Sequence, residues 1–143
     1  MGTKIIVAID GSENAERAIA WCAEHAPALD AEVIAVHAIE PPRYTGLAPS
    51  YIWVRSASAQ QRESRRERAT REWCKHLATS GVPFRVEVVD GEPADAVARV
   101  AREEGAALVV TGRLGFGPVR EHLVGSTSRA LTHSLNVPLV IVP

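Results

Sequence analysis

The sequence has few aromatic residues, only two cysteines and no long hydrophobic run. Aromatic residues make up 5% of the 143 positions, and Cys22 and Cys74 form neither a CxxC pair nor a set with the spacing of metal ligands. Isolated cysteines of this kind predict buried, reduced thiols in a cytoplasmic protein. No stretch reaches the ~18 apolar residues of a transmembrane helix, and the apolar run 5–9 is too short for a secretory signal.

The chain also lacks an excess of either charge. Its 16 Lys and Arg residues and 17 Asp and Glu residues give a net charge of −1. Such a balance provides no general attraction to nucleic acid or to an anionic membrane. The cations that gather between 62 and 75 are interrupted by carboxylates, which indicates an exposed, ion-paired helix face. We therefore expect neither nucleic acid nor a membrane as a partner.

Three common catalytic or cofactor motifs are missing as well. No G-x-x-x-x-G-K-[ST] occurs, which disfavours a P-loop NTPase, and no G-x-G-x-x-G opens a helix after the first strand, which disfavours a dinucleotide cofactor. No G-x-S-x-G nucleophile elbow occurs either. Because no paired acidic residues accompany a phosphate-binding pattern, we expect no catalytic residue and no metal ligand among the side chains.

What the sequence does have is an alternation of two hydrophobic periods from one end to the other. Short β-branched runs predict buried strands, and apolar positions three and four residues apart predict helices. In the helix expected at 57–79, the apolar positions are Ala69, Trp73 and Leu77, flanked by Cys74 and Ala78. The expected strands are 4–9, 32–39, 84–89, 107–111 and 138–142, and the expected helices are 15–26, 57–79, 93–104 and 126–135.

This alternation predicts an α/β fold in one domain, residues 1–143. We expect a doubly wound, five-stranded parallel sheet in the order 3-2-1-4-5, with helices on both faces. Ligands of such sheets bind at the carboxyl ends of the strands, beside the point where the strand order reverses. Asp10 and Gly112 follow the two strands that flank this point. Residues 41–56, with Tyr51 and Trp53, are expected to form a long surface loop and are a candidate lid.

The segment 111–128 carries the strongest chemical signal. Its glycines lie between a predicted strand and a predicted helix, where they let the backbone approach phosphate oxygens and direct N–H groups at them. Ser126 is expected to cap the helix, whose N-terminus attracts anions. The hydroxyls of Ser126, Thr127 and Ser128 are further phosphate donors. From these residues alone, a capped glycine-rich turn without any ligand stays open.

The spacing within this segment resembles that of a known family. Gly112-x2-Gly115-x9-Gly125-Ser126 is similar to the G-x2-G-x9-G-[ST] signature of the universal stress protein family, ATP-binding type. The resemblance extends over the chain, because 7–12, 36–38 and 137–143 are similar to the family's first, second and last strands. It implies a stress-response regulatory protein that binds ATP, with any Mg²⁺ or Mn²⁺ ion held by the phosphates.

The resemblance also implies a role for each matching residue. Asp10 would hold the ribose or base end of ATP, and Ala8 and Ala38 would line the adenine pocket. Arg113 departs from the family pattern, because its cation stands one position earlier than in many members. Contact with a phosphate and exposure to solvent are therefore both open for Arg113. The implied phosphate cradle consists of Gly112, Gly115, Gly125, Ser126 and Thr127.

Several alternatives remain open at this point. Asp10 is able to act only as a turn former or helix cap, and His37 only as a hydrogen-bonded histidine at a strand end. A slow ATPase or self-phosphorylating enzyme would use the same pocket, and a nucleotide-free dimeric interaction protein would not use it. A phosphate cradle without paired acidic residues favours binding over phosphoryl transfer.

The last strand carries the expectation for a protein partner. Residues 138–142 are apolar, contain no charge and form an edge of the sheet in the expected order. An apolar edge strand invites pairing with another chain. We therefore expect a homodimer through 138–142, and the family resemblance implies the same.

Overall fold

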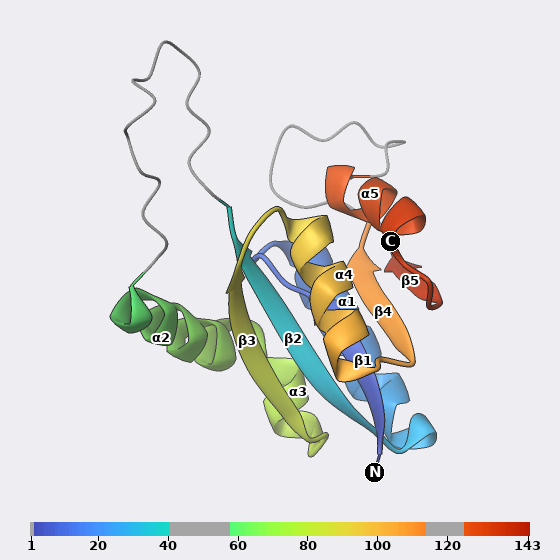
Figure 1. Ribbon diagram of the computed structural model, residues 1–143. Helices are drawn as coiled ribbons and strands as arrows, with labels where there is room; N and C mark the ends of the chain where they lie inside the picture. Colours follow the sequence, from blue (N-terminus) through green and yellow to red (C-terminus); the bar gives the residue numbers. More distant parts are fainter. Residues whose placement is uncertain (1, 41–57, 114–124) are drawn as a thin grey trace.

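In the computed structural model, which describes residues 2–40, 58–113 and 125–143, the chain forms a five-stranded parallel sheet (Figure 1). The strand order is β3-β2-β1-β4-β5. The predicted α/β fold and strand order are therefore confirmed. The expected loop 41–56 and Gly115 lie outside the described residues.

The sheet brings the ends of two strands that are distant in sequence to one edge. Val7 of the first strand pairs with Val110 of the fourth, so the residues two positions further on, Ile9 and Gly112, reach this edge at the same level. It is the carboxyl edge of the sheet, at the top of Figure 1. The strands are β1 (Thr3–Ala8), β2 (Ala31–Ile39), β3 (Phe84–Asp90), β4 (Leu108–Gly112) and β5 (Leu139–Val142).

Helices cover both faces of the sheet, as expected for a doubly wound fold. The helices are α1 (Glu13–His25), α2 (Ala59–Arg68), α3 (Lys75–Ser80), α4 (Pro93–Glu104) and α5 (Ser126–Ser134). Ile5, Val7 and Ile9 pack on the side of α1 and α3, which we call the α1 face. Ile6 and Ala8 pack on the side of α4 and α5, the α4/α5 face. No helix within the described ranges is long and apolar enough to cross a membrane.

The helix expected at 57–79 is not continuous. A π-helical turn, Ala69–Trp73, follows α2, and the chain leaves helical geometry at Cys74 (φ −101°, ψ 28°) before α3 begins. The Cys74 N–H donates to the Ala69 carbonyl at 3.1 Å, a bond spanning five residues. Ala69, Cys74 and Leu77 are buried and Trp73 is half-buried. Of the two flanking positions expected from the sequence, Cys74 is buried, and the expectation is wrong at Ala78, which is exposed.

The expectation for the cap of the last helix is also wrong by one residue. Gly125 is the N-cap of α5, and Ser126 is its first helical residue. Glycine provides no side-chain oxygen, so no side chain caps this helix. Ser128 and Leu131 are the buried residues of α5, and Ser134 is exposed. Among the described residues, no side chain therefore accepts a hydrogen bond from the N–H groups at the start of α5.

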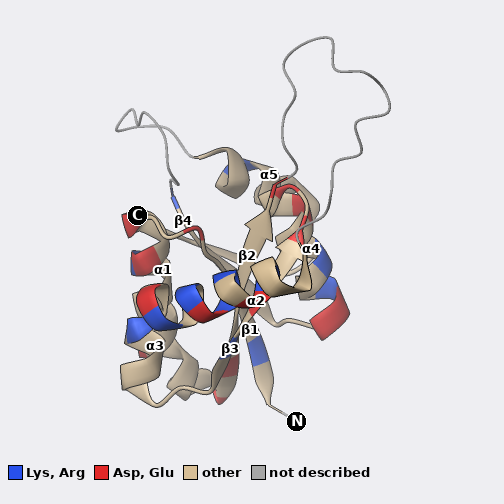
Figure 2. Cartoon of the chain, turned by 90° about the vertical axis from the view of Figure 1, so that its left-hand side faces the viewer, with Lys and Arg blue, Asp and Glu red and all other residues tan. Residues whose placement is uncertain are grey.

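The helix α2 lies outside the core. It has no buried residue, and a capping box at Ser58 and Gln61 begins it. Figure 2 shows cations and anions alternating along α2. Arg66 pairs with Glu63 within α2, and Arg68, the last residue of α2, pairs with Glu72 of the following turn at 3.0 Å. These contacts agree with the ion-paired, solvated face expected from the sequence.

Candidate functional site

Asp10 lies directly after β1, in the turn that leads into α1. Its Oδ1 accepts a hydrogen bond from the Ser12 N–H at 2.9 Å. Ser12 is the N-cap of α1, and its Oγ accepts from the Ala15 N–H at 3.2 Å. Asp10 therefore has the turn-forming role left open by the sequence. Its Oδ2 has no hydrogen-bond partner in the part of the chain that the structure describes, so it is available to a ligand.

Ala8 and Ala38 lie on the same face of the sheet. Ala8 packs against the core of the α4/α5 face. Ala38 follows Val36 by two positions on β2, and Val36 belongs to that core, so Ala38 points the same way. Both alanines are half-buried at the carboxyl edge. The structure therefore allows the adenine-pocket role that the resemblance implies for them.

His37 points to the opposite face. Its ring meets the Trp73 indole edge-on, with centroids 5.1 Å apart and planes at 84°. Its Nδ1 lies 3.3 Å from the Ile9 carbonyl oxygen. Burial lowers the pKa of His37, while the bond to Ile9 and the charge of Asp10 oppose that change and the charge of Arg65 adds to it. Of the two roles open for His37, the hydrogen-bonded structural one is present.

Gly112 has a packing reason to be glycine. A Cβ at this position would lie 2.6 Å from the carbonyl oxygen of Asn14 and 2.7 Å from its carbonyl carbon. Real Cβ atoms do not approach backbone atoms so closely, so the first turn of α1 requires the bare backbone here. This packing reason is independent of the phosphate approach that the sequence predicts for Gly112.

The two ends of the glycine-rich segment are fastened together. The Gly125 N–H donates to the Arg113 carbonyl at 2.7 Å, and the Arg113 N–H donates to the Val142 carbonyl at 2.9 Å. The buried Ser128 Oγ donates to the Gly112 carbonyl at 2.7 Å. Ser128 thus connects α5 to the end of β4. Because its hydroxyl proton is used in this bond, Ser128 is not available as the phosphate donor that the sequence suggested. These bonds fix the start of α5 beside the end of β4.

The backbone of Arg113 meets the start of α5 at a place that we call the Arg113 corner. The first helical bond of α5 runs from the Arg129 N–H to the Gly125 carbonyl, so the N–H groups of 126–128 have no acceptor within the helix. The Nε of Arg113 is buried, and it has no hydrogen-bond partner among the described residues. A buried donor without a partner costs about 1–3 kcal/mol, more when it is charged. Anions are the groups that satisfy donors of both kinds.

The two cysteines belong to the core rather than to a site. Burial raises the pKa of Cys22 to about 12 and that of Cys74 to about 11. Both thiols are therefore protonated at neutral pH and unreactive in the folded chain, as expected from the sequence. Within the described ranges there is no group of three or more His, Cys, Asp or Glu side chains able to hold a metal ion.

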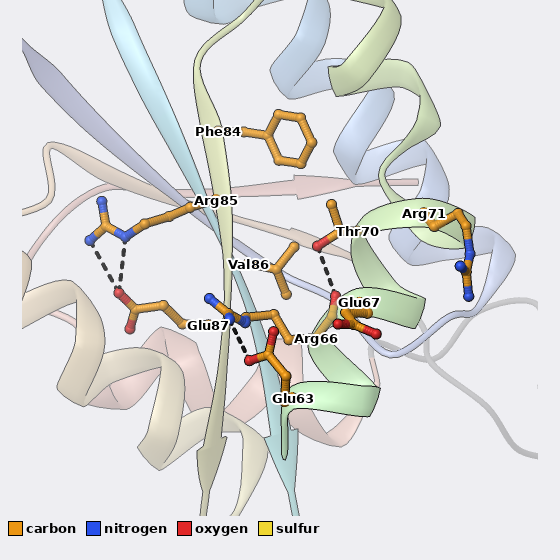
Figure 3. A pocket seen from close by; sticks show the side chains of 9 residues that line it. All are labelled: Glu63, Arg66, Glu67, Thr70, Arg71, Phe84, Arg85, Val86 and Glu87. Atoms are coloured by element: carbon orange, nitrogen blue, oxygen red, sulfur yellow. Dashed lines mark hydrogen bonds and ion pairs between the residues drawn. The ribbon is translucent and has the colours of Figure 1, made fainter. Parts of the chain in front are cut away.

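A separate hollow of about 660 Å³ lies between α2 and the edge strand β3 (Figure 3). Phe84 and Val86 provide its apolar surface, and Arg85 pairs with Glu87 at 3.1 Å on the strand. Its lining contains as many carboxylates as guanidinium groups, so it offers no net attraction to an anion. Its lining residues are Glu63, Arg66, Glu67, Thr70, Arg71, Phe84, Arg85, Val86 and Glu87.

Most of the residues singled out from the sequence meet at the carboxyl edge. Ala8, Asp10 and Ala38 lie at or near the ends of β1 and β2, whereas Gly112, Arg113, Gly125, Ser126 and Thr127 lie where β4 ends and α5 begins. Gly115, and Tyr51 and Trp53 of the candidate lid, lie outside the described residues. Sequence reasoning missed two contacts: that of Trp73 with the turn around Asp10, and the hydrogen bond from Ser128 to the Gly112 carbonyl. The five-residue spacing of Ala69 and Cys74 was the available signal for the Trp73 contact. No signal in the sequence indicated the Ser128 hydrogen bond.

These features define an open, doubly wound α/β protein in which Arg113 and the start of α5 lie beside the topological switch point. The chain belongs to the universal stress protein family, whose model matches residues 1–143. A universal stress protein of Thermus aquaticus, that of the QAH/OAS sulfhydrylase 3′ region, is 34% identical over 140 residues, which cover 96% of each chain.

Solved structures agree on the fold. A universal stress protein in complex with cAMP has a TM-score of 0.70 and 23% identity, and the match covers 99% of this chain and 97% of that one. A universal stress protein from Archaeoglobus fulgidus in complex with dAMP has a TM-score of 0.68 and 22% identity, with 99% and 98% covered. At these identities the likeness concerns the fold.

Proposed function

We propose that residues 1–143 form a single adenine-nucleotide-binding regulatory domain, with ATP as a ligand and the nucleotide between the ends of β1 and β4. The observation that carries this proposal is the corner at Arg113. There, the Arg113 carbonyl accepts from the N–H of Gly125, the N-cap of α5, and the buried guanidinium Nε of the same residue has no partner among the described residues. A phosphate supplies the negative oxygens that both sets of donors lack.

The assignment of the residues combines the roles that the family resemblance implies with the arrangement of the carboxyl edge. Arg113 and the backbone N–H groups of Ser126 and Thr127 bind phosphate, and Gly112 and Gly125 let the chain form the cradle. Asp10, whose Oδ1 is engaged by Ser12, presents Oδ2 to the ribose or the base. Ala8 and Ala38 leave room for the adenine ring. The sequence motif adds Gly115 to the cradle, and a Mg²⁺ or Mn²⁺ ion would bind through the phosphates.

The two liganded relatives support the choice of nucleotide class. The ligands of these two complexes, cAMP and dAMP, share an adenine base and a single phosphate. A site with one cationic corner and small residues beside it matches these two shared parts. The number of further phosphates is the part of the proposal that rests on the motif.

Calorimetric titration with ATP, ADP, AMP and GTP, with and without Mg²⁺, tests the proposal. We expect the adenine nucleotides to bind more tightly than GTP. Arg113→Gln is expected to weaken ATP binding by about ten-fold or more, because a hydrogen bond to a charged group contributes about 1.5–3 kcal/mol. Arg102→Gln, an exposed arginine at the other end of the sheet, is the matched control and should bind as the wild type does.

Two results would count against the proposal. The corner is not the phosphate site if Arg113→Gln binds ATP as tightly as Arg102→Gln does. A nucleotide-free interaction protein is the better description if no nucleotide binds at millimolar concentration. Release of phosphate from bound ATP in a single-turnover assay would replace the regulatory domain by the slow ATPase.

We also propose that two chains pair through β5. The two edges of the sheet differ in charge. On β3, Arg85 contacts both Glu87 and, at 2.9 Å, Glu104, and charged edges resist pairing. On β5, the four residues of the strand are apolar and half-exposed. An antiparallel two-fold pair would satisfy the free backbone groups of this edge.

Light scattering tests the pairing directly. We expect a mass twice that of the 15.4-kDa chain, and a single-chain mass for Ile141→Lys. Arg85→Lys, which leaves the charge of the opposite edge unchanged, is the control and should remain dimeric. A monomeric wild type excludes the pairing, and a dimeric Ile141→Lys variant excludes β5 as its interface.

A further inference from the structure

Trp73 reaches the Asp10 turn because the helix before it is interrupted. The π-helical turn Ala69–Trp73 ends with the bond from the Cys74 N–H to the Ala69 carbonyl. It adds one residue to the turn, so Ala69 and Cys74 both face the core and Trp73 lies at the edge of that core. Turns of this kind are rare and occur often at functional sites, since they cost regular hydrogen bonding.

The Trp73 indole lies directly on Gly11. A Cβ at Gly11 would be 2.7 Å from indole Cε2, 2.8 Å from Cζ2 and 3.0 Å from Nε1. Gly11 also has φ +81°, a conformation that residues with a Cβ rarely adopt. Two independent features therefore require glycine here: the left-handed turn and the aromatic ring that covers it.

His37 completes the contact from β2. Its ring packs edge-on against Trp73, and its Nδ1 is 3.3 Å from the carbonyl oxygen of Ile9. Ile9 is itself fastened to β2 by its N–H bond to the Val36 carbonyl at 2.9 Å. Residues 9 and 11 are thus both held by the aromatic pair. Asp10, which the proposed function assigns to the nucleotide, is the residue between them.

We propose that Trp73 and His37 are positioning residues of the nucleotide site, which act through Asp10 from the opposite face of the sheet. This inference rests on the proposed function and deepens it. The aromatic pair fixes the turn 9–12 before the ligand arrives, so that the Asp10 carboxylate does not have to be ordered on binding. Neither ring contacts the nucleotide, because both lie on the α1 face.

A double-mutant cycle of ATP affinities distinguishes a positioning role of Trp73 from simple core packing. We expect Trp73→Ala to weaken ATP binding about three- to ten-fold, the range that corresponds to the loss of a pre-ordered side chain. In an Asp10→Ala background, the same change should alter affinity less than about two-fold, because residues that act through one group are not additive. Trp73→Phe, which keeps an aromatic ring, should recover most of the affinity.

Trp21→Ala is the matched control. Trp21 is also half-buried and packs against the same core, but its ring stacks on His25 at a centroid distance of 4.2 Å. Trp21→Ala should lower the thermal midpoint of unfolding without changing the dissociation constant for ATP. If Trp73→Ala does not fold, His37→Ala provides the same cycle, since it removes both the edge contact and the Ile9 bond.

The outcomes separate this inference from the proposed function. The positioning role is overturned if Trp73→Ala binds ATP as the wild type does. It is also overturned if Trp73→Ala weakens binding equally with and without Asp10. Failure of the wild type to bind any adenine nucleotide overturns the proposed function and the inference together, whereas unchanged ATP binding in Asp10→Ala removes only the positioning role.

Discussion

At the carboxyl ends of β1 and β2, the two faces of the sheet are filled differently. On the α1 face, aromatic rings of Trp73 and His37 cover the strand ends. On the α4/α5 face, the same strands present Ala8 and Ala38. Because successive residues of a strand point to opposite faces, neighbours in the sequence build these two unlike surfaces.

From this difference we infer which face of the sheet supports the proposed nucleotide site and which face receives the nucleotide. The filled α1 face holds the turn after β1 and admits no Cβ at Gly11 or Gly112. The α4/α5 face has small side chains beside the Arg113 corner. We therefore assign the ligand to the α4/α5 face and the rigidity of its site to the α1 face. Each of the following predictions tests this assignment of different roles to the two faces.

Gly112→Ala should have the largest effect, since the new Cβ would meet the backbone of α1 at 2.6 Å. We expect a loss of about 3 kcal/mol in the free energy of unfolding by urea, at the upper end of the cost of overpacking. Gly105→Ala is the control, because it has φ +64° but no atom within 4 Å of the added Cβ. It should lose only about 1 kcal/mol. Equal losses would mean that α1 yields and that this face is not tightly filled.

Ala38→Leu should instead disturb the α4/α5 face, to which the ligand is assigned. The larger side chain would occupy the proposed base position, and the resulting crowding of about 1–3 kcal/mol should weaken ATP binding ten- to a hundred-fold. Its thermal midpoint should stay near that of the wild type. Ala107→Leu, at an exposed position on the amino edge, should leave the dissociation constant unchanged. Retained affinity in Ala38→Leu would move the base to another surface.

The contact between Gly11 and Trp73 predicts a measurable coupling. Gly11→Ala should destabilise the wild type both by its left-handed backbone and by its clash with the indole. In a Trp73→Ala background only the backbone cost remains, so the two changes should couple by about 1 kcal/mol in urea unfolding. Additive effects would show that the indole moves aside freely and does not hold the turn.

The pH dependence of stability should show the smallest effect. Burial lowers the pKa of His37 below its usual 6.5, so the unfolded chain takes up the proton first as the pH falls. The stabilisation is therefore complete above pH 6.5 and is lost below it. We expect the wild type to lose more unfolding free energy than His37→Asn between pH 7 and 5, by under about 1 kcal/mol after solvent screening. Parallel pH profiles would show that His37 is not desolvated by Trp73.

Local patterns predicted most of the elements and part of the site. The strand at 32–39 and the helix beginning at Pro93 were recognisable because burial on a strand or helix repeats within a few residues. The spacing of Gly112, Gly125 and Ser126 identified the segment that joins β4 to α5. The cap was misplaced to Ser126 because residue preference alone does not distinguish an oxygen-bearing cap from a glycine whose N–H is bound elsewhere.

The sequence by itself determined the order of strands and helices, the family and the position of the carboxyl edge, since these follow from local periodicity and a spaced motif. Only the tertiary structure decided why Gly11 and Gly112 are glycine, which face His37 occupies and what Ser128 binds. Each of these depends on an atom supplied by a distant segment: the Trp73 indole, the Asn14 carbonyl or the Gly112 carbonyl. Packing between segments is not periodic along the chain, so no local pattern encodes it.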